Sequence, residues 1–325
     1  AVGKRVLRGK PDLASYDAIV VSSSAGKDSQ AALEQVVLEA RRRKVDGRVL
    51  VSHCDLGRIE WPGSPELAQL QAAYWGVPSI VIRRTAKPTD LLDLMVKRGQ
   101  WPGFGTRYCT AAMKRGPGDV LFTSMGRDYR DQGNRPPIRI LHCMGIRADE
   151  SAERGAMPPY YHDLRASTSN KHVDVWLPVH KWKAGTSPAG VPDNKPGAGP
   201  QVWEAIEASG APFHPAYETG MARLSCVFCP LADWDSLVIA GRYNPELLEA
   251  FIAAERKVGP FKGNRSLRQA KTQIESGDVP RTGGHWADEC SVCWEPGDPL
   301  GNLLAVRVKR SLPHVTSRPH SAQVA

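Results

Sequence analysis

A polar segment of small residues, 22–29, separates an apolar run at 18–21 from a stretch with apolar residues at helical spacing, 30–43. In a strand-to-helix turn, small residues allow consecutive backbone N–H groups to point at one anion, and the positive end of the following helix strengthens that site. The P-loop NTPase pattern is absent, and a serine-rich turn without a ligand is the alternative interpretation. We expect the following residues to line a phosphate site: Ser22, Ser24, Ala25, Gly26, Lys27, Asp28 and Ser29.

A second group of charged residues follows the apolar run 138–144, which ends before Gly145. Arg147 and Arg154 carry guanidinium groups that can bind phosphate in a bidentate manner. Glu150 is suited to orienting an arginine or a metal-bound water. The spacing of three and four residues equally fits a salt-bridge ladder at the start of a helix, and the residues alone favour that ladder.

Cysteines form the third group, with seven in the chain. An odd number, without an export signal, argues against a disulfide framework. The pairs Cys226/Cys229 and Cys290/Cys293 each place two thiols on one turn. Two thiolates need further ligands to complete a zinc site or to hold an iron–sulfur cluster, and spacing alone does not separate iron from zinc. A redox dithiol is a third alternative. Cys143 lies in an apolar run and is predicted to be a small buried side chain.

The elements that must position these groups alternate between strand-like and helix-like in the first half of the chain. The expected strands are 18–22, 48–52, 79–82, 138–144 and 173–177, and the expected helices are 30–43, 66–75 and 89–98, the last capped by Thr89. This alternation predicts an α/β fold with a doubly wound, mostly parallel sheet, which binds ligands at the carboxyl ends of its strands. Further helices are expected at 202–209, 233–241, 245–258 and 266–276.

The domain organisation predicted from these patterns has four parts. They are a nucleotide-binding α/β domain at 1–182, a Pro/Gly-rich loop at 183–201, a helical, cysteine-containing region at 202–308 that packs on the first domain, and a flexible tail at 309–325.

The composition of the 325 residues is that of a soluble globular protein, with a formal net charge of +9. This charge permits an anionic substrate or a nucleic-acid partner without proving either. No apolar run of about 18 residues predicts a membrane span, and no apolar leader is found, so we expect a cytoplasmic protein.

Several segments together resemble the phosphoadenosine phosphosulfate (PAPS) reductase-like ATP pyrophosphatases, also called the PP-loop family. The turn at 24–29 is similar to their S-G-G-x-D-S loop, with Ala25 in place of a glycine. Asp55 follows the second strand, where this superfamily often carries Asp-x-Gly. The other matching segments are Arg107–Pro117 (R-x-C-T-x-x-L-K-x-x-P), Gly145–Arg154 (G-I-R-x-x-E-S-x-x-R) and Pro215–Cys229 (P-x-Y-x-x-G-x-x-R-x-x-C-x-x-C).

The combination of R-x-C-T with a later C-x-x-C most resembles the ATP pyrophosphatase subunit of DNA phosphorothioation systems (DndC/SspD type). The resemblance implies an adenine nucleotide alpha-hydrolase-like fold and ATP with Mg²⁺. It implies catalytic roles for Lys27, Asp28, Arg147 and Glu150, and nucleotide contacts at Asp55, Gly145 and Arg154. With it, substrate contact is favoured over the salt-bridge ladder. The implied partners are DNA, a cysteine desulfurase or other sulfur donor, and further subunits of a modification complex.

The resemblance also favours a [4Fe–4S] cluster, with zinc second. The implied ligands are Cys109, Cys226, Cys229 and Cys290, with Cys293 or Cys143 as alternatives for the fourth position. Three other functions stay open. The first is a sulfonucleotide (PAPS or APS) reductase with Cys290 as nucleophile, which is weakened because Ser291 and Cys293 depart from the reductase pattern. The second is a tRNA or small-molecule thiolation enzyme, and the third is a nucleotide-binding module without turnover.

Overall fold

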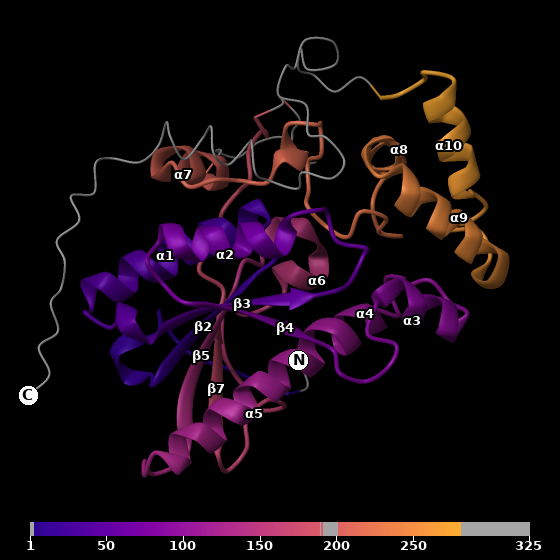
Figure 1. Ribbon diagram of the computed structural model, residues 1–325. Helices are drawn as coiled ribbons and strands as arrows, with labels where there is room; N and C mark the ends of the chain where they lie inside the picture. The colour runs from indigo at the N-terminus through magenta and orange to yellow at the C-terminus, as the bar shows by residue number, and fades with distance from the viewer. Residues whose placement is uncertain (1–2, 189, 191–200, 281–325) are drawn as a thin grey trace, which may run out of the picture.

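The computed structural model describes residues 3–188, 190 and 201–280 (Figure 1). Seven strands form one sheet in the order β1-β6-β7-β5-β2-β3-β4. The strands are β1 (Lys4–Val6), β2 (Ala18–Ser23), β3 (Val49–Asp55), β4 (Ser79–Arg83), β5 (Ile138–Met144), β6 (Tyr160–Asp163) and β7 (Lys171–Trp176). Strands β2, β3, β4, β5 and β7 are parallel, and β6 pairs antiparallel with both β1 and β7. The α/β fold class with a mostly parallel sheet is therefore confirmed.

Helices cover both faces of this sheet. The helices of the described residues are α1 (Lys27–Arg42), α2 (Ser64–Tyr74), α3 (Leu91–Arg98), α4 (Tyr108–Thr110), α5 (Gly116–Asp131), α6 (Ala152–Gly155), α7 (Gln201–Ser209), α8 (Trp234–Tyr243), α9 (Pro245–Val258) and α10 (Leu267–Glu275). In Figure 1, α1 and α2 lie on one face and α5 lies on the other. Helix α7 packs over α1, α9 packs against α3, and α8 and α10 pack against α9 and each other.

The strand order reverses next to β2, and this reversal determines where a ligand can enter. β2 pairs with β3 on one side and with β5 on the other, while the chain runs from β2 through β3 and β4 before it returns to β5. A reversal of this kind leaves a crevice at the carboxyl ends of the two central strands, because their crossover helices lie on opposite faces. The turn after β2 and the loop after β5 meet at this point.

Three of the apolar clusters among the described residues show how the layers are held together. One lies between the sheet and α1, around Ile19, Leu33 and Val36. A second, with Val20 and Ile140, lies against α5 on the opposite face. A third cluster joins the loop after β3 and helix α3 to the C-terminal helices, and its members include Ile59, Leu91, Phe228, Phe251 and Leu267. The described residues after 201 therefore share a core with the first half of the chain.

Several elements differ from the sequence-based expectation. Helix α5 was not expected, because its first turn contains Gly116 and Gly118 around a proline, although proline is tolerated at that position. The prediction that Thr89 caps α3 is wrong: Asp90 is the N-cap, and its carboxylate accepts hydrogen bonds from the N–H groups of Leu92 (2.9 Å) and Asp93 (3.2 Å).

The short outer strands β1 and β6 were also missed. The tail at 309–325 lies outside the described residues. Within the described ranges, no helix combines the length and apolar character needed to cross a membrane.

Candidate nucleotide site and thiol group

The turn between β2 and α1 contains one residue in an unusual conformation. Ala25 has φ +58°, in the left-handed region, and its side chain is fully buried. Glycine reaches this region at no steric cost, whereas a residue with a Cβ is strained there. Gly26 follows as the N-cap of α1, and a Cβ there would lie 3.3 Å from the Ser24 hydroxyl and from the Tyr217 hydroxyl. The turn is thus tightly enclosed and its backbone conformation is specific.

Three backbone N–H groups of the turn already donate to hydroxyl oxygens of the protein. The pairs are Ser24 N to Ser29 Oγ (3.2 Å), Ala25 N to Ser23 Oγ (3.1 Å) and Lys27 N to Tyr217 OH (2.9 Å). Burial raises the pKa of Tyr217, so its hydroxyl stays protonated at neutral pH. An anion that bound these amides would have to take the place of the hydroxyl acceptors.

The Lys27 side chain lies inside the protein. Its ammonium donates to the carbonyl of Ala222 at 2.9 Å, lies 3.7 Å from the Asp28 carboxylate and is 5.5 Å from the centre of the Tyr217 ring. The residue is 1% exposed. The Lys27 ammonium therefore links the turn to the segment that leads to Cys226, through the Ala222 carbonyl.

The loop after β5 packs directly against the first turn of α1. A Cβ at Gly145 would lie 2.3 Å from the Asp28 carbonyl oxygen and 2.6 Å from the Ser29 nitrogen, so only glycine fits. Next to it, the guanidinium of Arg147 donates through Nε to Asp28 at 2.7 Å and through Nη1 to both oxygens of Asp149 at 2.8 Å. Arg147 is 1% exposed. The two loops that meet at the strand reversal are thereby joined by an ion pair between a buried guanidinium and a partly buried carboxylate.

Glu150 and Arg154 form the i,i+4 ion pair expected for a salt-bridge ladder. Arg147 does not continue that ladder through its guanidinium, which instead binds the two aspartates. Its backbone N–H donates to Glu150 at 3.1 Å. Glu150 and Arg154 therefore form the local ion pair of a salt-bridge ladder, whereas Arg147 makes a long-range contact with α1.

The remaining predicted contacts lie around this point in different ways. Ser24 is exposed at the turn and Ser29 is buried, with its hydroxyl donating to the Gly26 carbonyl at 2.8 Å. Ser22 is turned toward His142, at 2.8 Å, on the sheet face covered by α5, and so lies apart from the turn's amides. Asp55 ends β3, accepts from the Gly57 N–H at 2.7 Å and pairs with Arg83 at 2.7 Å.

Three predicted thiols gather on the side of the third apolar cluster. Cys109 lies in α4, at the start of a helical stretch that includes a π-helical segment, Ala111–Arg115, before α5 begins. Cys226 and Cys229 lie in a loop held by a hydrogen bond from Val227 N to the Ile59 carbonyl (2.8 Å). The pKa of Cys226 is raised to about 12, mainly by burial, and the neighbouring thiols Cys229 and Cys109 contribute to this rise.

Lys114 acts in the opposite direction on this group, because its positive charge lowers the pKa of Cys226 and Cys229. A nearby cation favours a cluster of thiolates over a cluster of thiols. Among the described residues, Cys109, Cys226 and Cys229 do not form a group whose three sulfur atoms all lie within 4.8 Å of one another. A tetrahedral zinc site with Zn–S bonds of about 2.3 Å requires sulfur atoms about 3.8 Å apart, so zinc would require closure of the group.

The other cysteines are placed differently. Cys143 is fully buried in the cluster under α1, with Ile19 and Val21, so the structure does not bring it to the thiol group and the proposal of Cys143 as a ligand is not supported by its position. Cys290 and Cys293 lie outside the described residues.

Sequence reasoning missed Cys54 as a possible ligand. It packs against the same apolar cluster as Cys109 and Cys226, and its pKa responds to Lys114 and Glu60, as does that of Cys226. Cys54 follows the strand-like run at 48–52, and this position in the sequence is the signal that the thiol lies at the carboxyl end of a strand.

No protein-family model matches the sequence, and no curated protein matches it. Among solved structures, the chain is similar to phosphoadenylyl-sulfate (PAPS) reductase from Candida auris in a phosphate complex, with 14% sequence identity and a TM-score of 0.37, over 64% of this chain and 81% of that chain. The fold class stated above rests on the strand order and directions of this chain itself.

Proposed function

We propose that this chain is an ATP pyrophosphatase that adenylates a backbone phosphate of DNA, as the first step of sulfur insertion. The observation that carries the proposal is the Asp28–Arg147 ion pair, which joins the β2–α1 turn to the loop after β5 at the reversal of strand order. This is the place where open parallel sheets bind nucleotides. A group of three partly buried thiols lies in two segments that pack on the apolar cluster after β3.

In the proposed step, an oxygen of the DNA phosphate attacks the α-phosphorus of ATP. The bond from that phosphorus to the bridging oxygen breaks, and pyrophosphate leaves with the electron pair. Both reacting groups are anionic, so catalysis consists mainly of holding them together and offsetting their charge. Mg²⁺, which normally accompanies ATP, would offset charge on the phosphates. Amides of the turn would receive the β- and γ-phosphates, and Arg154, which is half-buried, would contact the transferred phosphate.

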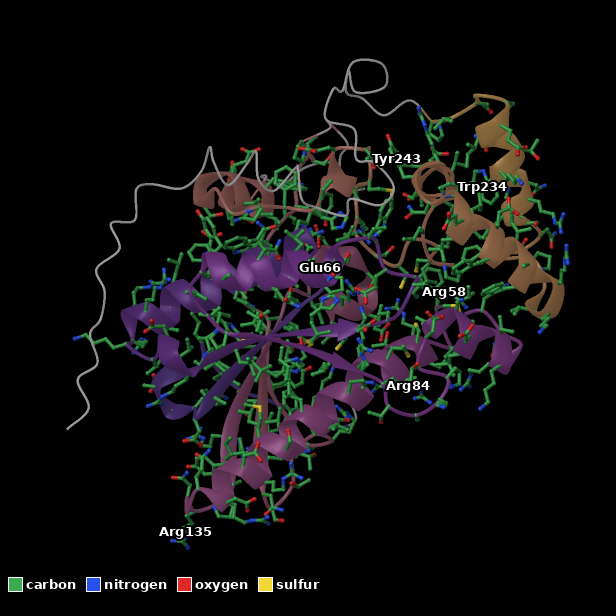
Figure 2. The ribbon with its side chains drawn as sticks, in the orientation of Figure 1. Arg58, Glu66, Arg84, Arg135, Trp234 and Tyr243 are labelled. Atoms are coloured by element: carbon green, nitrogen blue, oxygen red, sulfur yellow. The ribbon has the colours of Figure 1, made fainter. Side chains whose placement is uncertain are left out.

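The basic balance of the chain supports an anionic polymer as acceptor. Lys114 is an exposed cation beside the thiol group, and Arg58, Arg83 and Arg115 are also exposed. Figure 2 shows Arg58 and Arg84 on the side where α3 and the C-terminal helices meet the sheet, whereas Arg135 lies at the far end of α5. Phosphate contacts of this kind give affinity that falls steeply with salt. A sulfur-donor protein such as a cysteine desulfurase would supply the sulfur that replaces the adenylated oxygen.

For the thiol group we propose a [4Fe–4S] cluster held by Cys109, Cys226 and Cys229. The donor set fits, because the three thiols come from two segments anchored on one apolar cluster and a cation, Lys114, stands beside them. Cys290 or Cys54 would supply the fourth thiolate. Such a cluster would supply electron transfer or would bind sulfur on its way to the DNA.

The proposal is tested by pyrophosphate release from ATP, measured with the full chain, double-stranded DNA and a sulfur-donor protein. Lys27→Ala and Asp28→Ala should both abolish release. Lys27→Ala removes the buried positive charge at the turn, and Asp28→Ala removes the carboxylate that binds Arg147. Arg135→Ala is the matched control, since it removes a positive charge far from the turn. Unchanged release in both loop variants would refute the proposed site.

Anaerobic purification tests the cluster. The wild-type protein should be brown and contain iron and acid-labile sulfide, and Cys226→Ser should lose both. Cys143→Ala, which changes a thiol buried in the cluster under α1, should retain the colour. A colourless wild-type protein with stoichiometric zinc would exclude the cluster.

A sulfonucleotide reductase is the second candidate, because it would use the same turn with a different reaction. It predicts release of sulfite from PAPS or APS that depends on thioredoxin or glutathione and is lost in Cys290→Ser. Sulfite release without pyrophosphate release from ATP would favour that enzyme over the first proposal.

A further inference from the structure

Two histidines and an aspartate form a compact group on the antiparallel pair β6–β7, in the half of the sheet away from β4. His162 Nδ1 lies 2.8 Å from Asp174 Oδ1, and His172 Nε2 lies 3.1 Å from the same oxygen. The two imidazole rings have their centres 4.1 Å apart. Among the described residues, this is the group of three potential ligands whose ligand atoms all lie within 4.8 Å of one another.

The register of the hairpin explains this placement. His162 and Asp174 are directly opposite partners on β6 and β7. His172 is two residues before Asp174 on the same strand and therefore points to the same face of the sheet. Side chains from three positions thus converge without any loop having to bring them together, and the strands make the geometry rigid.

A further contact orients the aspartate. The second carboxylate oxygen of Asp174 accepts a hydrogen bond from the Tyr16 hydroxyl at 2.7 Å, and Tyr16 is in turn 2.6 Å from the Tyr160 hydroxyl. Outer partners of this kind orient the ligating carboxylate in metal sites. Asp174 is 2% exposed and His162 is 6% exposed, whereas one third of the His172 side chain is exposed. The group is therefore buried on one side and open to solvent on the other.

We propose that His162, His172 and Asp174 form a binding site for a divalent transition-metal ion, with zinc as the preferred ion. Zinc takes histidine nitrogen and carboxylate oxygen at about 2.0–2.2 Å in a tetrahedral arrangement, which places neighbouring ligand atoms about 3.3 Å apart. The observed 2.8 and 3.1 Å separations need only small adjustments to reach that spacing. On the exposed side of His172, water would complete the coordination.

This site is separate from the thiol group. Strands β5 and β2 lie between β7 and β3 in the sheet, and the thiols lie beyond the carboxyl end of β3. Its chemistry is also different, because it offers nitrogen and oxygen rather than sulfur. Binding would tie β6 to β7 and would stabilise the edge of the sheet, since a ligand that binds only the folded state stabilises it.

Cobalt(II) distinguishes the two sites, because thiolate ligands give intense near-ultraviolet charge-transfer absorption and nitrogen–oxygen ligands do not. We expect the full-length Cys226→Ser variant, titrated with Co²⁺ and compared with wild type, to keep one equivalent whose visible ligand-field bands come from nitrogen and oxygen ligands. His172→Ala in that background should lose this equivalent. His142→Gln, a histidine on the other face of the sheet, is the matched control and should retain it.

Thermal unfolding gives a second readout. Zinc at 100 times its Kd should raise the Tm of the Cys226→Ser variant by about 5 °C and leave the Cys226→Ser/His172→Ala variant unchanged. His172 is partly exposed, so its replacement should leave the fold intact, which circular dichroism would verify. Equal cobalt stoichiometry and equal zinc-dependent shifts with and without His172 would overturn the proposal.

Discussion

Replacement of Gly145 by alanine examines the contact between the loop after β5 and the first turn of α1. The added Cβ would lie 2.3 Å from the Asp28 carbonyl oxygen and 2.4 Å from its carbon, about 1 Å short of the 3.4 Å at which ordinary contact begins. Both neighbours are backbone atoms, so no side chain can rotate away. The start of α1 must therefore move by about 1 Å relative to β5, and the Asp28–Arg147 pair must move with it.

A displacement of about 1 Å at a reacting centre lowers catalytic rates by roughly 10²-fold, and overpacking of this kind costs about 1–3 kcal/mol of unfolding free energy. We expect Gly145→Ala to fold, to bind ATP weakly in calorimetry and to release pyrophosphate at about 1% of the wild-type rate. Gly118→Ala is the control, because its Cβ would meet no atom within 4 Å and alanine favours the helical conformation. Wild-type ATP affinity and turnover in Gly145→Ala would refute the packing argument.

Two further predictions concern stability. Arg147→Met should cost about 3–5 kcal/mol in urea unfolding, because it leaves Asp28 and Asp149 without their buried partner, and an unchanged midpoint would contradict this. Burial lowers the pKa of His142 and His214 to about 4, so the folded state holds both neutral while the unfolded chain protonates near pH 6.5. Between pH 6.5 and 4 the unfolded state therefore binds more protons, and unfolding free energy should fall by about 2 kcal/mol per histidine at pH 5, a loss that His142→Gln should reduce in urea melts at pH 7 and 5.

The central strands and the turn were predictable because their signals are local. The apolar run of β2, the small polar turn and the helical spacing of α1 follow one another within 25 residues of sequence. Helix α5 was not predictable, because Gly116-Pro117-Gly118 gives the signature of a turn although only the first helical turn contains it. The outer strands β1 and β6 are three and four residues long, too short for an alternating pattern to be recognised.

The candidate site was predictable as a set of residues but not as a set of contacts. The β2–α1 turn, Arg147 and the Cys226/Cys229 pair were selected as candidates from their residue types and spacing. The hydroxyl of Tyr217, which accepts from the Lys27 N–H, lies 190 residues away in the sequence, and Asp28 lies 119 residues from Arg147. No local pattern encodes such pairings, because they arise from the packing of the C-terminal segment and of β5 against α1.

The most direct test of the account is the identity of the products formed from ATP. With DNA and a sulfur-donor protein present, the full chain should convert α-³²P-labelled ATP to AMP and pyrophosphate, and the label should pass transiently to the DNA. ADP and inorganic phosphate as products, or ATP bound at a position that leaves residues 24–29 without contact in a nucleotide-soaked crystal, would contradict it.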